Sequence, residues 1–138
     1  MKITAKQWML MISLGLYSGL SMAAVCNSQI NNNAVGGLSV PANATCIING
    51  TAVDGNVNVQ KGGSLVLHNS SVSGSIQADA AKSVQLINSA VEGDVRTAGV
   101  TGLLKVDKSS VEGKLYCSSA TRLQANMSSI NGTVGKCK

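Results

Sequence analysis

Two glutamates have a type and a spacing that could support acid–base chemistry. Glu92 and Glu112 are twenty residues apart, and each precedes the glycine of the same short motif. If that motif recurs once per coil of a stacked β-structure, the two carboxylates are neighbours at roughly 5 Å, the distance between adjacent strands. Retaining glycosidases place their two catalytic carboxyl groups at a similar separation. A carbohydrate-binding or polysaccharide-acting β-helix protein is therefore one functional class to consider.

Other features favour a protein that is not an enzyme. His68 is the single histidine and has no repeated partner, so no Ser-His-Asp set can be built on it. A chain of 138 residues also lacks the long loops that form a sugar cleft. We therefore predict no catalytic residues and interpret Glu92 and Glu112 as solvated side chains. Ice binding is not favoured either, because the threonines do not fall into one row: Thr51, Thr97, Thr101, Thr121 and Thr133.

Four cysteines form two pairs with the same spacing. Cys26 and Cys46 are twenty residues apart, and so are Cys117 and Cys137. Residues one coil apart lie on neighbouring strands, within disulfide reach, and closing a twenty-residue loop would contribute about 3 kcal/mol. A metal site is the alternative, but the sequence contains no Cys-x-x-Cys motif and its histidine is distant from both pairs. We predict two disulfides that flank the repeats, no bound metal and no other cofactor.

A fivefold repeat defines the elements that must position these residues. Each copy has Val or Ile two residues before a glycine and an aliphatic residue two residues after it. A short fixed period is typical of a solenoid, whereas an antiparallel sandwich needs no strict spacing between glycines. We predict an all-β parallel β-solenoid with coils 53–71, 72–90, 91–110 and 111–129 and a closing fragment 130–138. The repeat glycines are Gly55, Gly74, Gly93, Gly113 and Gly132.

Alternation of apolar and polar residues predicts two strands in each coil. In the first coil, Val53, Val57 and Val59 would point inward from one strand, and Leu65 and Leu67 from the next. The repeat glycine falls between inward aliphatic residues, where a missing side chain would let the backbone of another face approach. Because the sequence contains no phenylalanine, the core must consist of small aliphatic side chains.

Small polar side chains recur just before the first valine of each copy. When such residues stack at a corner, their hydroxyl and amide groups can bond the turn backbone. We interpret these rows as side chains that hydrogen-bond and stabilise the turns at one corner of the coils, rather than as a binding face. The rows are Ser70, Ser89, Ser109 and Ser128, then Ser71, Ala90, Ser110 and Ser129, and the shorter row Asn69 and Asn88.

The N-terminal segment predicts export. Lys2 and Lys6 precede an apolar stretch that ends in small residues, which is the layout of a signal peptide cleaved after Ala23 or Ala24. The apolar run is shorter than the roughly 18 residues of a membrane-spanning helix, and Val25 stands where a lipobox has a small residue. We predict a signal peptide at 1–24, an N-terminal cap with a first partial coil at 25–52, and solenoid repeats with a C-terminal closing coil at 53–138.

The charge pattern argues against nucleic acid as a partner. The net charge of +5 falls by two when Lys2 and Lys6 are removed with the signal peptide. The remaining basic residues are dispersed singly, without the clustering that nucleic-acid binding requires. A solvated surface explains this distribution best.

The repeat is clearest in three segments: Val91-Glu92-Gly93-Asp94-Val95, Leu104-Lys105-Val106 and Val111-Glu112-Gly113-Lys114-Leu115. In these segments it resembles the repeat of the bactofilins, polymer-forming bacterial cytoskeletal proteins with a right-handed β-helix. The likeness covers residues 53 to 134, and it implies the fold and its right-handed winding. The export signal and the cysteine pairs lie outside the bactofilin pattern.

We predict a small exported structural or interaction protein of the bacterial envelope, located in the periplasm, at the cell surface or outside the cell. Its partner would be a protein or an envelope polysaccharide. No transmembrane segment would remain after cleavage. Self-association through the coil ends is a further option, as in a polymer-forming protein. The candidate contact surface is an outward row with several charges and one aromatic residue: Glu92, Asp94, Arg96, Glu112, Lys114 and Tyr116. Asp94 and Lys114 would form an opposite-charge pair on neighbouring strands, and Arg96 and Tyr116 would be stacked neighbours.

Overall fold

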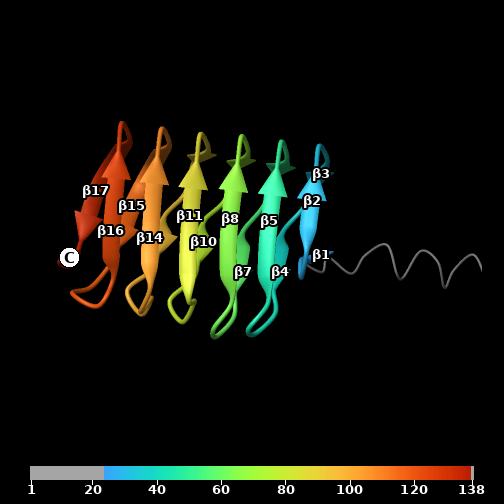
Figure 1. Cartoon of the computed structure of the whole chain (residues 1–138). Helices are drawn as coiled ribbons and strands as arrows, with labels where there is room; N and C mark the ends of the chain where they lie inside the picture. Colours follow the sequence, from blue (N-terminus) through green and yellow to red (C-terminus); the bar gives the residue numbers. More distant parts are fainter. Residues whose placement is uncertain (1–23, 138) are drawn as a thin grey trace, which may run out of the picture.

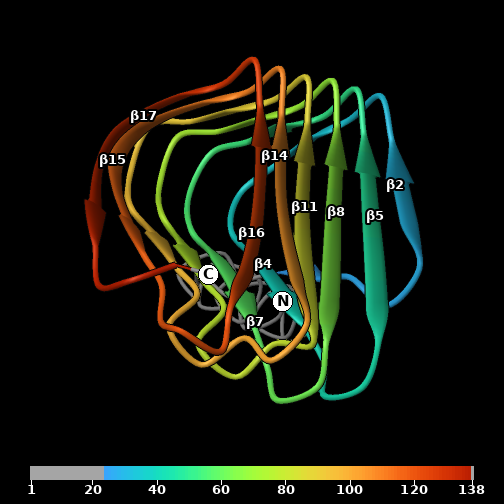
Figure 2. The ribbon, with the colours of Figure 1, turned by 60° about the vertical axis from the view of Figure 1, so that its left-hand side comes forward.

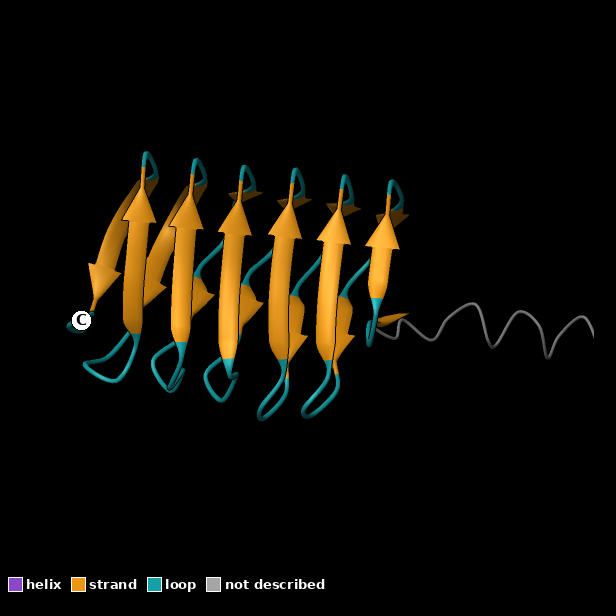
Figure 3. Cartoon of the chain, viewed as in Figure 1, coloured by secondary structure: helices purple, strands orange, loops and turns teal. Residues whose placement is uncertain are grey.

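The protein is a right-handed parallel β-solenoid, as predicted. The computed structural model describes residues 24–137, which form strands and short connections (Figures 1 and 3). In Figure 1 the long strands run upward at the front, and the chain returns behind them while it advances from right to left. The predicted signal peptide lies outside the described residues except for Ala24. Residues 24–137 include no helix long and apolar enough to cross a membrane.

One side of the solenoid is a flat sheet of six parallel strands, one from each coil (Figure 2). We call it the long-strand side, because most of its strands have five residues. It consists of β2 (Gln29–Asn31), β5 (Thr45–Asn49), β8 (Ser64–His68), β11 (Ser83–Ile87), β14 (Leu103–Asp107) and β16 (Arg122–Asn126).

Shorter strands form the other two sides of each coil. The lead-valine side contains β3 (Ala34–Val35), β6 (Ala52–Val53), β9 (Ser71–Val72) and β12 (Ala90–Val91). The post-glycine side contains β1 (Ala24–Val25), β4 (Leu38–Val40), β7 (Val57–Val59), β10 (Ile76–Gln77) and β13 (Val95–Arg96). Two longer strands, β15 (Ser110–Tyr116) and β17 (Ser129–Val134), run through both sides. Residues 25–52, predicted as an N-terminal cap with a first partial coil, carry most of β1 to β6.

The first strand predicted for each coil is divided in two in most coils. Val53, Val57 and Val59 all point into the core, as expected. Between Val53 and Val57 the chain bends at the glycine motif, so that β6 and β7 lie on different sides of the coil. The alternation of side chains continues across this bend, which is why the sequence pattern resembled one strand.

The core is a narrow stack of aliphatic side chains. Leu65, for example, lies in an inward column that joins the long strands of five coils. Its side chain and that of Leu104 are completely buried, whereas Leu123 in the last coil is only half-buried. Each coil thus covers the one before it, and burial falls where the stack ends.

The repeat glycines allow close approach between successive coils, and the expectation that another face would approach is wrong. The N–H of Gly74 donates to the carbonyl oxygen of Gly55 at 3.0 Å, and the N–H of Gly93 donates to that of Gly74 at 3.0 Å. Gly113 donates to Gly93 in the same way, at 3.1 Å. A Cβ atom on Gly93 would lie 2.6 Å from the Gly74 oxygen. The glycines therefore form a ladder along one corner of the solenoid.

The fifth repeat glycine does not continue this ladder. Strand β17 shifts its register against β15 after Val111, so Gly132 lies opposite Lys114 rather than Gly113. Thr133 then stands opposite Leu115, at the position where the sequence alignment had placed Val134. Val134 consequently faces outward and is exposed. The closing fragment contains the motif but not its geometry.

The serine row before the first valine bonds the corner backbone, as expected. The hydroxyl of Ser89 donates to the carbonyl oxygen of Ile87 at 2.9 Å, and it accepts the N–H of Ser70 at 3.3 Å. Each corner is preceded by a residue with positive φ, where glycine and asparagine are favoured. Lys108 and Met127 occupy this conformation at φ 50 and 48, after the asparagines of the earlier coils. The asparagine side chains stack, with Asn88 donating to Asn69.

Both predicted disulfides are present, but the paired cysteines are not equivalent positions of successive coils. Cys26 and Cys46 have Cα atoms 5.4 Å apart, and Cys117 and Cys137 are 5.2 Å apart. Ala24 pairs with Leu38, so the first coil is shorter than the repeat. Cys46 pairs with Leu65 on the long-strand side, whereas Cys26 directly follows β1. The first disulfide therefore links consecutive coils across a corner rather than along a ladder. In the second, the N–H of Cys117 donates to the carbonyl oxygen of Val134, so Cys137 is not the residue opposite Cys117 in the strand register.

Candidate functional site

The six residues of the predicted contact surface lie around one corner rather than in one flat row. Glu92 and Glu112 directly follow the paired positions Val91 and Val111 on the lead-valine side. Arg96 and Tyr116 are paired on the post-glycine side. Asp94 and Lys114 lie between these pairs, at the glycine corner. The structure therefore presents three distinct pairs with different environments.

The two glutamates are adjacent in the stack and both are exposed to solvent. Glu92 lines a shallow depression of about 150 Å³ together with Asp54 and Ser73, and Glu112 is not among the residues that line it. Glycosidase carboxylates work on opposite sides of a bond that is held in an enclosed site. Within the described residues, the geometry brings the predicted pair together but forms no cleft around both members.

Asp94 has a structural role, and the predicted side-chain ion pair with Lys114 does not form. Its carboxylate accepts the backbone N–H of Lys114 at 2.7 Å. Ser75 and Asn56 act in the same way one and two coils earlier: Ser75 accepts the N–H of Asp94 at 3.0 Å, and Asn56 accepts the N–H of Ser75 at 2.8 Å. This second corner ladder explains why acceptor side chains recur after the glycine. A carboxylate that accepts a backbone N–H is less available for an outside partner.

Arg96 makes the ion pair that the sequence did not predict. Its Nε lies 3.4 Å from a carboxylate oxygen of Asp79, and both side chains are about half exposed. Its guanidinium also lies over the ring of Tyr116, 4.8 Å from the centroid. Arginine held between a carboxylate and an aromatic face is a stable surface arrangement, and cation–π contacts of this kind contribute about 0.5–1 kcal/mol. Arg96 and Tyr116 are thus neighbours, as predicted.

A long groove lined mostly by small side chains, both polar and apolar, runs along the serine corner and was not predicted as a binding feature. It has a volume of about 1040 Å³ and crosses five successive coils. Three residues from each coil line it: Gly50–Ala52, Asn69–Ser71, Asn88–Ala90, Lys108–Ser110 and Met127–Ser129. The recurring small side chains were visible in the sequence. Their effect on the surface was not, because a hollow depends on how far the flanking asparagine and lysine side chains project.

The serines of the groove fall into two groups. Ser70, Ser89 and Ser109 are almost completely buried, and their hydroxyls are used at the corner. Ser71, Ser110 and Ser129 belong to the outward row of the lead-valine side and pair with one another along the stack through Ala90. The outward row is the part of the groove that a ligand could contact.

The described residues provide no ready metal centre. No three His, Cys, Asp or Glu side chains of residues 24–137 come close enough together to hold an ion. All four cysteines are joined in disulfides.

No protein-family profile, no curated protein and no solved structure matches this chain. The parallel β-solenoid that the resemblance to the bactofilins implied is confirmed by the strand pairing. No family match shows that the chain is a bactofilin.

Proposed function

We propose that this protein is an exported, non-enzymatic rod of the bacterial envelope that holds a rigid surface for a partner. The observation that carries the proposal is the pair of disulfides, one in the first two coils and one in the last two. Disulfides persist in oxidising compartments such as the periplasm or the cell exterior. The signal-peptide pattern at residues 1–24 supports the same location.

A structural role is supported by the way the polar residues are used. The recurring serines, glycines and Asp94 bond one coil to the next. Within the described residues, every buried side-chain nitrogen or oxygen has a hydrogen-bond partner. A stack with satisfied corners and a closed aliphatic core is suited to rigidity, because buried polar groups without partners would destabilise it. These features support a scaffold rather than a reaction centre.

Export and oxidation can be tested together in a bacterial host. We expect the full chain to be recovered from the periplasmic or extracellular fraction with its N-terminus at Ala24 or Val25 and without free thiols. The control is a variant that lacks residues 2–20, which should stay in the reducing cytoplasm with alkylatable cysteines. Recovery of the uncleaved full chain in the cytoplasm with four free thiols would refute the proposal.

A second candidate function is binding of a linear envelope polysaccharide in the serine groove. The groove supports it because it is continuous over five coils and is lined by serine and asparagine side chains from several of them. Small side chains let an extended polymer lie close to the backbone, whereas the described groove offers no aromatic ring for stacking. The carboxylates Glu92 and Glu112 stand beside the groove on the same lead-valine side.

Filling the groove should separate these candidates. If the groove binds polysaccharide, Ser71→Tyr/Ser110→Tyr should weaken co-sedimentation with insoluble cell-wall polysaccharide about tenfold, equivalent to about 1.4 kcal/mol. Gln85→Tyr, on the long-strand side, is the matched control and should leave sedimentation unchanged. Glu92→Gln/Glu112→Gln is the third variant, and loss of a measured polysaccharide hydrolysis in it would replace both proposals with an enzymatic one. Equal sedimentation of all variants would reject the groove as the binding site.

A further inference from the structure

The two disulfides lie in different surroundings. Cys26 and Cys46 are 2 % and 0 % exposed, so their sulfurs are enclosed by the core. Cys117 is 4 % exposed, but its partner Cys137 is only half-buried. Thiol–disulfide exchange requires a thiolate to reach one sulfur. The C-terminal bond offers such a sulfur at Cys137, whereas the N-terminal bond does not.

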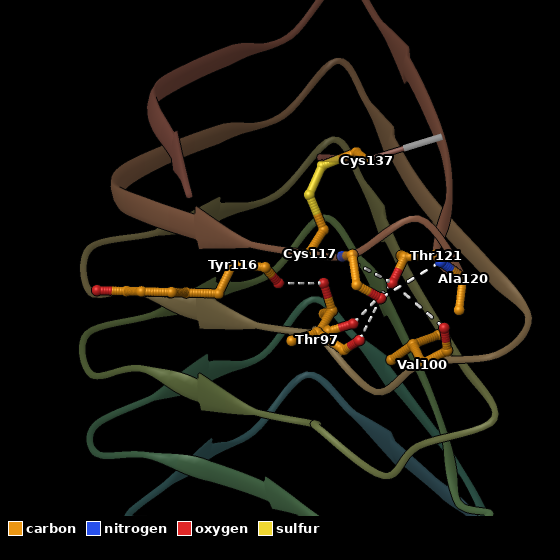
Figure 4. The surroundings of a disulfide bond; sticks show 9 residues. Thr97, Val100, Tyr116, Cys117, Ala120, Thr121 and Cys137 are labelled. Atoms are coloured by element: carbon orange, nitrogen blue, oxygen red, sulfur yellow. Dashed lines mark hydrogen bonds between the residues drawn. A yellow bond between two sulfur atoms is a disulfide. The ribbon is translucent and has the colours of Figure 1, made fainter. Parts of the chain in front are cut away.

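The Cys117 end of the C-terminal bond is anchored in the sixth coil (Figure 4). The hydroxyl of Thr97, which is fully buried, donates to the carbonyl oxygen of Tyr116 at 2.8 Å. The hydroxyl of Thr121, also fully buried, donates to the carbonyl oxygen of Thr97 at 2.9 Å. These bonds tie the backbone around Cys117 to the preceding coil independently of the disulfide.

The Cys137 end belongs to a segment with little burial of its own. Thr133, Val134, Gly135 and Lys136 are all exposed. Strand β17 also carries the register shift against β15, so its second half presents Thr133 where earlier coils present an aliphatic side chain. Backbone pairing with β15 holds this half, and just beyond β15 the N–H of Cys117 donates to the Val134 oxygen at 3.0 Å. Exposed strand pairing without apolar burial opens readily.

We infer that the Cys117–Cys137 disulfide is a redox latch that holds the last strand on the end of the solenoid. The reductant is a dithiol, whether a small molecule or a dithiol oxidoreductase. Its thiolate attacks the sulfur of Cys137, the bond to Cys117 breaks, and Cys117 leaves as a thiolate that takes a proton from water. The second thiol of the reductant then attacks the mixed disulfide and releases Cys137 as a thiol. The protein disulfide gains two electrons and the dithiol becomes a disulfide.

Opening the latch changes what the end of the rod presents. Strand β15 pairs with β12 and β13 on one side and with β17 on the other. When the second half of β17 detaches, the backbone of β15 near Leu115 and Tyr116 loses its partner. An unpaired strand edge can accept another extended chain. Reduction therefore converts a closed end into an end that can bind a strand, while the N-terminal disulfide keeps the first coils joined.

The latch can be tested on purified, oxidised mature protein, so the outcome does not depend on where the protein resides in the cell. Dithiothreitol is added, samples are quenched with iodoacetamide, and alkylated peptides are quantified by mass spectrometry. We expect Cys117 and Cys137 to become alkylated roughly tenfold faster than Cys26 and Cys46, because access limits exchange. Amide exchange should increase in 132–137 of the partly reduced protein and stay unchanged in 76–96.

Two matched variants complete the test. Cys117→Ala/Cys137→Ala should show the faster exchange in 132–137 without reductant, and Cys26→Ala/Cys46→Ala should retain the slow exchange there. Equal reduction rates for the two disulfides would overturn the inference. So would wild-type protection of 132–137 in the Cys117→Ala/Cys137→Ala variant. Should that variant fail to fold, the partly reduced wild-type protein still decides the question.

Discussion

Replacing Leu65 with alanine is expected to lower the free energy of unfolding by about 2–5 kcal/mol, the usual cost of removing a buried leucine side chain. Leu65 is fully buried in the third coil and has a coil on each side of it. Neighbouring coils are fixed by backbone ladders on three sides, so they have little freedom to collapse into the cavity. Urea unfolding followed by circular dichroism measures the change.

Leu123→Ala is the matched control for this substitution. Leu123 lies in the same inward column, three coils further on, but it is only half-buried. Folding buries less apolar surface at Leu123 than at Leu65, so we expect the free energy of unfolding to fall by about 1 kcal/mol or less. Equal losses for the two variants would contradict the view that each coil is buried by the next.

Gly93→Ala should destabilise the protein by about 1–3 kcal/mol, the range for overpacking a tight site. The added Cβ would lie 2.6 Å from the carbonyl oxygen of Gly74 and would also meet the Ser75 hydroxyl. The backbone must shift to make room, which would lengthen the hydrogen bond between the two glycines. Thermal unfolding of the wild type and the variant gives the comparison.

Gly132→Ala provides the control, because the same motif glycine has space there. A Cβ on Gly132 would have its nearest neighbour at 3.8 Å, an ordinary van der Waals distance, in the Lys114 side chain. We expect a change of less than about 0.5 kcal/mol, as for surface substitutions in general. A large loss at Gly132 would mean that the closing fragment keeps the repeat register in solution.

The latch and the proposed scaffold role place different demands on the two ends of the rod. A scaffold needs its coils to stay stacked, and the enclosed Cys26–Cys46 bond serves this at the first coils. An end that can open must depend on an accessible bond, which Cys137 provides. The same residue type at the same spacing therefore supports two roles, and the difference lies in burial.

For much of the candidate site, the sequence predicted which residues lie next to one another but not which contacts their side chains make. The repeat period placed Arg96 beside Tyr116 and Glu92 beside Glu112, because stacking in a solenoid follows directly from spacing. It did not predict that Asp94 would accept a backbone N–H or that Arg96 would pair with Asp79. Those contacts depend on side-chain direction at a corner, which a linear period does not encode.

The sequence by itself determined the solenoid, the inward columns and the cysteine partners. The solenoid and its columns follow from a local period, since residues one coil apart must meet when every coil buries the same aliphatic positions. The cysteine partners were predicted from the same spacing, but they are not equivalent positions and meet only because of how the terminal coils bend. Tertiary structure decided the three-sided outline, the register of the closing strand, the groove and the exposure of Cys137. These properties depend on where the chain bends and on what covers the last coil. A repeat specifies contacts between equivalent residues of successive coils. The last coil has no following coil to supply those contacts, so the burial of each side chain there depends on its few remaining neighbours.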